Sequence, residues 1–125
     1  MVGGGGGAPP HQKKMITTHI LDLGLGAPAS GITVILEIRQ QSEWTPVGRG
    51  VTDENGRLAT LTESFMLVPG TYRLAFDIAT YHRNQGFTVP FFPEAKITFN
   101  VRDTEEHYHV PLLLSPFGYS TYRGS

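Results

Sequence analysis

The chain has 125 residues, no cysteine and a formal net charge of −1, with ten Lys and Arg against eleven Asp and Glu. This length fits one domain with one core, and the lack of cysteine excludes disulfides and thiolate chemistry. No basic run is long enough to follow a phosphate backbone and no apolar run is long enough to cross a bilayer, so we expect neither nucleic acid nor a membrane as a partner. The N-terminus lacks the charged-then-apolar order of a signal peptide, which favours a soluble, cytoplasmic protein.

Residues 1–14 have a composition that differs from the rest of the chain. They contain five consecutive glycines, two prolines and two lysines. Such a segment buries no apolar surface and behaves as a flexible linker. We therefore expect a flexible Gly/Pro-rich tail over residues 1–14 and a folded domain over residues 15–125.

The hydrophobic period of the remaining chain is two residues, which is typical of strands with one buried face. Apolar and polar positions alternate over residues 32–39, 72–78 and 97–101. Turn signals separate such segments at residues 53–56, 69–70 and 90–93. The pattern predicts an all-β sandwich.

One segment departs from this pattern. Residues 78–86 fit two helical turns, and Gly86 is suited to end them. We therefore predict one short helix beside the β-sandwich.

An early strand carries the first candidate functional residue, His19. On this strand Thr17, His19 and Leu21 face one way, and the residues between them face the other. A lone histidine on a strand is more often structural than functional, so the local pattern alone assigns it no role.

His107 and His109 form a more specific pattern, because side chains two residues apart on a strand share a face. Two interpretations remain open for that face. A metal site would need His19 as a third ligand, far away in sequence and with no carboxylate obviously placed to help. A metal-free acid–base site needs only imidazoles, whose pKa near 6.5 lets them exchange protons at neutral pH, and we favour it.

A site of this kind needs a fixed positive charge for an anionic or carbonyl-rich substrate, and Arg57 and Arg123 are the candidates. Arg57 directly follows the turn at residues 53–56, although the local sequence alone favours a surface arginine that pairs with Asp53 or Glu54. Arg123 belongs to a C-terminal segment rich in hydrogen-bonding groups. Chain ends usually fray, so this composition favours a docked, functional terminus.

Two aromatic features have no assigned chemistry. Trp44 is interpreted as a structural aromatic at a strand end. Phe91 and Phe92, followed by Pro93, form an apolar loop patch that suits either a lid over the core or a subunit contact.

Four motifs in order make the chain resemble the transthyretin-related 5-hydroxyisourate hydrolases. They are Thr-His-Ile-Leu-Asp at residues 18–22, Thr-Asp-Glu-Asn-Gly-Arg at residues 52–57, the segment from His107 to Pro116, and the terminal Tyr-Arg-Gly-Ser. The terminal tetrapeptide is the hallmark that distinguishes these hydrolases from transthyretin, a hormone carrier of the same fold. The resemblance covers residues 15–125.

The resemblance implies a transthyretin-like β-sandwich of seven to eight strands with a short helix after the fifth. It implies a homotetramer, a dimer of dimers with active sites in the cleft between dimers. It also implies hydrolysis of 5-hydroxyisourate to 2-oxo-4-hydroxy-4-carboxy-5-ureidoimidazoline in purine (urate) catabolism, without a metal or other cofactor. The alternative is a transthyretin-type carrier of a small hydrophobic ligand, without catalysis.

The same resemblance assigns residues to roles. His19, Arg57 and His109 are the expected catalytic residues, with the two histidines activating water. His19, Arg57, Tyr122 and Ser125 are expected to contact the substrate. The roles of His107 and Arg123 stay open, although Arg123 and the Ser125 carboxylate suit an anchor for the tail.

Overall fold

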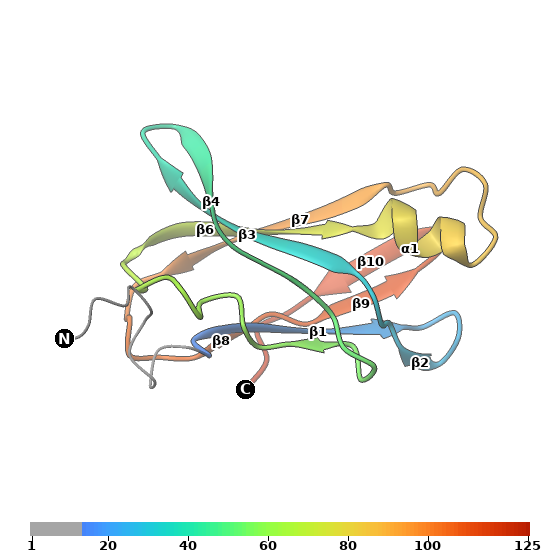
Figure 1. Ribbon diagram of the computed structural model, residues 1–125, viewed down its shortest axis with the longest axis horizontal. Coiled ribbons are helices and arrows are strands. Elements are labelled where there is room, and N and C mark those ends of the chain that lie inside the picture. Colours follow the sequence, from blue (N-terminus) through green and yellow to red (C-terminus); the bar gives the residue numbers. More distant parts are fainter. Residues whose placement is uncertain (1–13) are drawn as a thin grey trace.

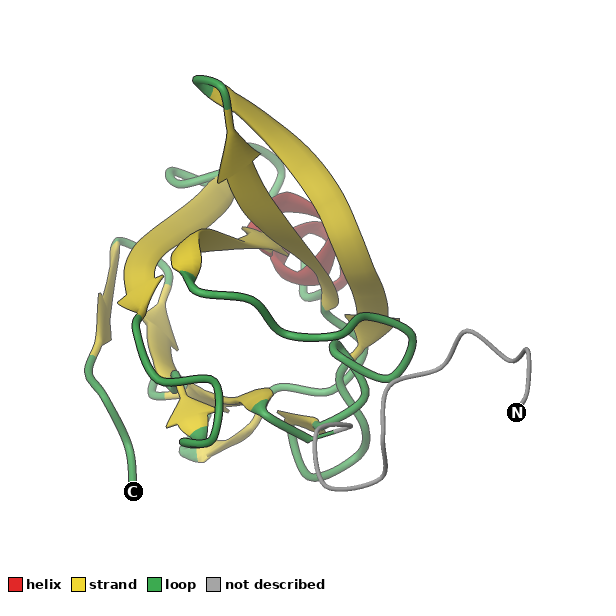
Figure 2. Ribbon diagram, turned by 90° about the vertical axis from the view of Figure 1, so that its left-hand side faces the viewer, coloured by secondary structure: helices red, strands yellow, loops and turns green. Residues whose placement is uncertain are grey.

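The computed structural model describes residues 14–125. Within them, ten strands form two sheets and one helix lies at one end of the sandwich. Figure 1 shows the two sheets as separate layers, and Figure 2 shows the space that they enclose. The tail predicted over residues 1–14 lies, apart from Lys14, outside the described residues.

The first sheet has four antiparallel strands in the order β4-β3-β6-β7. Their bounds are β3 (Thr33–Gln40), β4 (Glu43–Val51), β6 (Gly70–Asp77) and β7 (Glu94–Val101). The strands predicted at residues 32–39, 72–78 and 97–101 are confirmed as β3, β6 and β7. In β3 and β6 every second side chain is buried, because only one face of this sheet packs on the core.

A tight hairpin turn joins β3 to β4, and sequence reasoning did not find it. Gln40 pairs with Glu43, which leaves Gln41 and Ser42 as a two-residue turn with φ of 53° and 71°. Positive φ at both central residues defines a type I′ turn, which usually contains Asn-Gly. Trp44 follows at the start of β4, and the Arg73 guanidinium lies 4.2 Å from its ring centroid, so its predicted structural role fits these contacts.

The second sheet is built from shorter strands around a central one. They are β1 (Ile16–Asp22), β2 (Ala27–Pro28), β5 (Arg57–Leu58), β8 (Tyr108–His109), β9 (Leu112–Ser115) and β10 (Gly118–Thr121). β1 is antiparallel to β2 and β5 and parallel to β8 and β9, while β10 is antiparallel to β9. Three of the ten strands have only two residues, so the seven longer strands agree with the predicted sandwich of seven to eight.

The predicted helix is confirmed as α1 (Ile78–Asn84), although it follows β6, the fourth of the seven longer strands, and not the fifth. The Asp77 carboxylate accepts a hydrogen bond from the backbone N–H of Thr80 at 3.2 Å and so caps the first turn. Gly86, with φ of 98°, follows the helix end, as predicted for a glycine that can adopt the left-handed conformation. The Tyr81 hydroxyl donates to the Asp22 carboxylate at 2.7 Å and ties the helix to β1.

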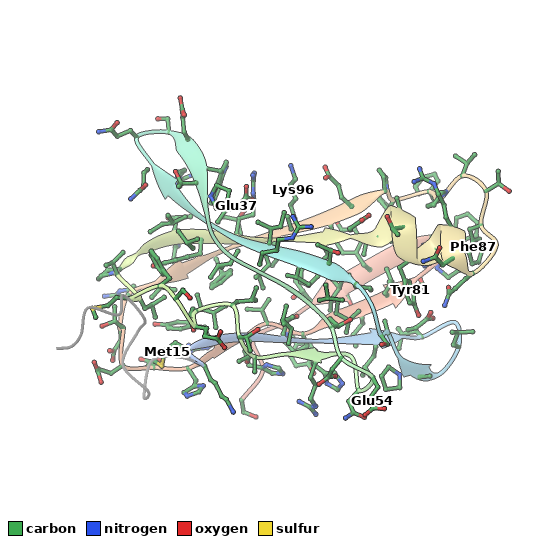
Figure 3. The ribbon with its side chains drawn as sticks, viewed as in Figure 1. Met15, Glu37, Glu54, Tyr81, Phe87 and Lys96 are labelled. Atoms are coloured by element: carbon green, nitrogen blue, oxygen red, sulfur yellow. The ribbon has the colours of Figure 1, made fainter. Side chains whose placement is uncertain are left out.

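One hydrophobic core fills the space between the sheets (Figure 3). Both sheets contribute fully buried side chains, which include Ile16, Ile20, Leu36, Tyr72, Leu74, Phe76, Leu112 and Leu114. Figure 3 also shows Glu37 and Lys96 on the outer side of the four-stranded sheet. No helix within residues 14–125 is long and apolar enough to cross a membrane.

Candidate active site

β1 presents the first site residues on its outward face. Thr17, His19 and Leu21 are half-buried, and they alternate with fully buried residues that face the core, as the period-two pattern predicts. His19 pairs with Arg57 in the antiparallel register of β1 and β5. Directly opposed residues project to the same face of a sheet, so His19 and Arg57 are neighbours.

The turn before Arg57 fixes where this arginine begins its strand. The Asp53 carboxylate accepts hydrogen bonds from the backbone N–H groups of Asn55 and Arg57, both at 2.9 Å. Gly56 has a φ of 75°, and a Cβ there would lie 2.4 Å from the carbonyl oxygen of Ile20, so only glycine fits. Asp53 therefore holds the backbone of Arg57, and within residues 14–125 neither Asp53 nor Glu54 forms an ion pair with its guanidinium.

His109 comes from the far end of the sequence. β8 runs parallel to β1 and sets His109 opposite Thr17. The Thr17 hydroxyl and Nδ1 of His109 are hydrogen-bonded at 2.8 Å. Tyr108 and Val110, on either side of His109, are buried in the core, which confirms that this histidine faces outward.

A pocket of about 460 Å³ opens beside these residues. It is lined by Thr17, Thr18, Arg57, Leu58, Ala59, His107, His109 and Ser125. The volume suits a small ligand. His107, whose role the sequence left open, thus shares the pocket wall with His109.

The pKa of His109 is lowered below its ordinary value of 6.5. The largest cause is burial, and the electrostatic effects of the nearby Arg57 and His19 add to it. Both causes disfavour the protonated ring. His109 is therefore a neutral imidazole at pH 7, which can accept a proton from water.

The C-terminal segment is docked, as predicted. Gly124 forms a β-bridge with His109, and its N–H donates to the His109 carbonyl at 2.8 Å. The Arg123 guanidinium donates to the Glu106 carboxylate at 2.9 Å and to the His107 carbonyl at 3.0 Å. It also lies 4.8 Å from the ring centroid of Tyr108. These contacts fit an anchoring role for Arg123, and they bring Ser125 to the pocket wall.

Tyr122 does not line this pocket, and neither does His19, which lies next to it through its pairing with Arg57. The Tyr122 side chain is 57% exposed. It lines a different pocket of about 270 Å³, together with Phe99, Val110 and Arg123. Within one chain, Arg57, His109 and Ser125 line one pocket, His19 lies beside Arg57, and Tyr122 lies elsewhere.

The metal interpretation of the histidines finds no support in the side-chain arrangement. Among residues 14–125, no group of three or more His, Asp or Glu side chains is arranged to hold a metal ion.

The sequence also missed one contact of the site. Thr17 had been placed on the face of His19, but its bond to His109 depends on the parallel pairing of β1 with β8, which no local signal reveals.

The two facing sheets, the single helix and the outward histidines define a sandwich of the transthyretin type. The structure matches that of transthyretin from Sparus aurata with a TM-score of 0.82 at 33% identity, covering 89% of this chain and 97% of that one. It matches a 5-hydroxyisourate hydrolase from Klebsiella pneumoniae with a TM-score of 0.75 at 36% identity, covering 88% of this chain and 97% of that one.

The sequence comparisons lead to the family. The model of the HIUase/Transthyretin family matches residues 16–124, and the chain belongs to that family. A probable 5-hydroxyisourate hydrolase of Caenorhabditis elegans is 44% identical over 110 residues, which are 88% of this chain and 81% of that protein. The family predicted from the four motifs is thus confirmed.

Proposed function

We propose that this chain hydrolyses 5-hydroxyisourate to 2-oxo-4-hydroxy-4-carboxy-5-ureidoimidazoline in urate catabolism, and that the pocket around His109 is the active site. The activity agrees with the relatives named hydrolases. The single observation that supports this location is the neutral, half-buried His109 beside Arg57 and His19 in a pocket of suitable size. We therefore conclude that this chain is an enzyme and not a carrier.

The reaction needs a base, a nucleophile and a group that stabilises negative charge. His109, assisted by His19, takes a proton from water as the water oxygen adds to a carbonyl carbon of the six-membered ring. The Arg57 guanidinium stabilises the oxyanion that forms. The ring C–N bond then breaks, the nitrogen takes up the proton, and a carboxylate and a ureido group remain.

Substrate contacts from the C-terminus complete the proposed site. Ser125, on the pocket wall, is suited to hydrogen-bond the substrate in the same chain. Tyr122 lies away from that pocket, so we assign its contact to the site of a neighbouring copy of the chain.

This assignment requires an oligomer, and we propose a homotetramer built as a dimer of dimers. β7 and β10 are the outer strands on one side of the two sheets, and outer strands have unpaired backbone groups that can pair with another chain. Phe91, Phe117 and Tyr119 are exposed and Phe91 lies 6.1 Å from Phe117 between ring centroids, which supports the subunit-contact interpretation of the loop. Sedimentation velocity measures the oligomer directly, and a monomer at assay concentration would contradict it.

Two broader proposals accompany the activity. Residues 15–125 form the hydrolase domain, in agreement with the family match over residues 16–124. The protein is cytoplasmic, since a chain without cysteine suits a reducing compartment.

The decisive experiment adds the purified chain to urate and urate oxidase and follows the ultraviolet absorbance of 5-hydroxyisourate. We expect faster decay that survives a metal chelator. A variant lacking residues 122–125 should lose most of this acceleration, whereas His11→Ala, outside the family match, should retain it. Unchanged decay with the full chain would instead favour the carrier alternative, which predicts binding of a hydrophobic ligand without turnover.

A further inference from the structure

The imidazole ring of His109 is held on two opposite edges. On one edge, Nδ1 is hydrogen-bonded to the Thr17 hydroxyl at 2.8 Å. On the other edge, Cδ2 faces Gly124 so closely that a Cβ added at residue 124 would lie 2.6 Å from it. These contacts fix the rotation of the ring and leave Nε2 as the nitrogen without a protein partner among the described residues.

The position of Thr17 is set by backbone pairing. Thr17 is opposite His109 in the parallel register of β1 and β8, and the backbone N–H of Val110 donates to the Thr17 carbonyl at 2.9 Å. Threonine is β-branched, and its χ1 is restricted in a strand. The hydroxyl is therefore aimed at Nδ1 by the sheet itself.

Gly124 closes the other edge, and its own position is also fixed. Its N–H is bonded to the carbonyl of His109, and the neighbouring Arg123 is anchored to Glu106 and to the His107 carbonyl. A side chain at residue 124 would meet Cδ2 and Cγ of the His109 ring at 2.6 and 3.4 Å and Cγ of Pro111 at 3.3 Å. Any residue larger than glycine must displace the ring or the tail.

We propose that Thr17 and Gly124 are positioning residues for His109. The Thr17 hydroxyl accepts a hydrogen bond from Nδ1–H, which leaves the lone pair on Nε2 free for water, and Gly124 lets the chain terminus pack against the Cδ2 edge. The inference rests on the proposed role of His109 as the base. The opposite tautomer has N–H at Nε2, where the base needs a lone pair.

The first test removes the hydroxyl while keeping the shape of the side chain. Thr17→Val should lower kcat about 10- to 100-fold, the range expected when a reacting group is misplaced, with little change in KM. Thr17→Ser keeps the hydroxyl and should restore most of kcat. The matched control is Thr45→Val on the exposed hairpin strand β4, which should behave like the unmodified chain. Equal kcat for Thr17→Val and the control would overturn the role of Thr17.

The second test reads the tautomer without turnover, from the ¹⁵N shifts of the His109 ring. The unmodified chain should show a protonated Nδ1 and an unprotonated Nε2 above pH 7, and Thr17→Val should show a mixture of both tautomers. A predominant Nε2–H form in the unmodified chain would overturn the proposal. Since this measurement needs no substrate, it decides the positioning claim even if the chain fails to hydrolyse 5-hydroxyisourate, a failure that would overturn the proposed function alone.

The third test addresses Gly124. Gly124→Ala should shift the His109 ring resonances and lower kcat about 10- to 100-fold. Gly118→Ala is the matched control, because a Cβ at residue 118 meets only the Ser115 hydroxyl at an ordinary 3.7 Å. Unshifted His109 resonances with unchanged kcat in Gly124→Ala would remove Gly124 from the proposal.

Discussion

The two sheets of this sandwich are built differently. The four-stranded sheet has strands of eight or nine residues in an antiparallel order. The second sheet mixes parallel and antiparallel pairs, and three of its strands have two residues each. All of the residues gathered at the candidate pocket belong to the second sheet, to its flanking loops or to the chain terminus.

This difference means that the first sheet contributes mainly to stability, whereas the second sheet also carries the candidate site. The central strands β3 and β6 of the first sheet bury alternate side chains and supply much of the core. The short strands β5 and β8 each pair with β1 and place Arg57 and His109, respectively, at the pocket. Substitutions at buried positions of the first sheet should therefore change the free energy of unfolding, and substitutions of the pocket residues on the second sheet should change turnover.

The largest expected effect is the loss of the base. His109→Gln should lower kcat about 100- to 10,000-fold, because general base catalysis contributes on that scale. The circular dichroism spectrum should stay unchanged, since His109 faces the pocket and not the core. Turnover close to that of the unmodified chain would show that the second sheet does not hold the base.

Arg57→Ala tests the charge opposite His19. We expect kcat to fall about 100- to 1,000-fold, as when one oxyanion donor is removed. The assay of 5-hydroxyisourate decay measures this, with Arg49→Ala on the exposed side of β4 as the control. A similar loss in both variants would point to a general charge effect instead of a site.

Leu74→Ala tests the first sheet. Leu74 is fully buried in β6, and such truncations lower the free energy of unfolding by about 2–5 kcal/mol. Urea denaturation at fixed protein concentration measures the loss, and kcat well below the melting temperature should be retained. Val51→Ala, on a side chain that is 54% exposed, should change stability little. A large loss of kcat in folded Leu74→Ala would contradict the separation of roles.

The pH dependence tests the state of His109. Because its pKa is lowered from 6.5, the acid limb of kcat/KM should have its midpoint below pH 6.5, with activity falling about tenfold per unit further down. Well above pH 6.5 both the folded and the unfolded chain carry a neutral ring. As the pH falls below 6.5, the unfolded chain binds the proton before the folded chain does. The free energy of unfolding therefore decreases with falling pH until the pKa of His109 in the folded chain is reached. A midpoint above pH 6.5 would contradict the neutral base.

The smallest expected effect is on the outer face of the first sheet. The Arg73 guanidinium donates to the Glu37 carboxylate at 2.8 Å, and Glu37→Gln should lower the free energy of unfolding by about 1 kcal/mol or less. Thermal denaturation measures this, with Glu94→Gln in the more exposed, 3.6 Å pair with Lys96 as the comparison. Any change in kcat would show coupling between the two sheets.

The sequence predicted those parts of the fold that have a local signal. Alternation located β3, β6 and β7, and the departure from alternation over residues 78–86, with Gly86 as its end, marked the helix. The β3–β4 turn was missed because Gln41 and Ser42 are unusual at positive φ. Strands of two residues are too short for a period to be recognised.

The site was predicted through motifs and not through geometry. His19, Arg57 and His109 were named because of their motif positions, and β1 does bring them together. The bond between Thr17 and His109 spans 92 residues, and the contact of Gly124 with the His109 ring follows from tertiary packing alone. The proposed contact of Tyr122 with the site of a neighbouring copy has no local signal in a single sequence.

The central place of β1 has a consequence for how the protein is made. This strand is synthesised well before two of its partners, β8 and β9, which pair with it from residues 108–109 and 112–114. Pairing between distant segments is slow, and an unpaired strand is prone to aggregate while it waits. The pocket should thus form only after β8 has been synthesised, and any chain released before residue 109 lacks the proposed base entirely.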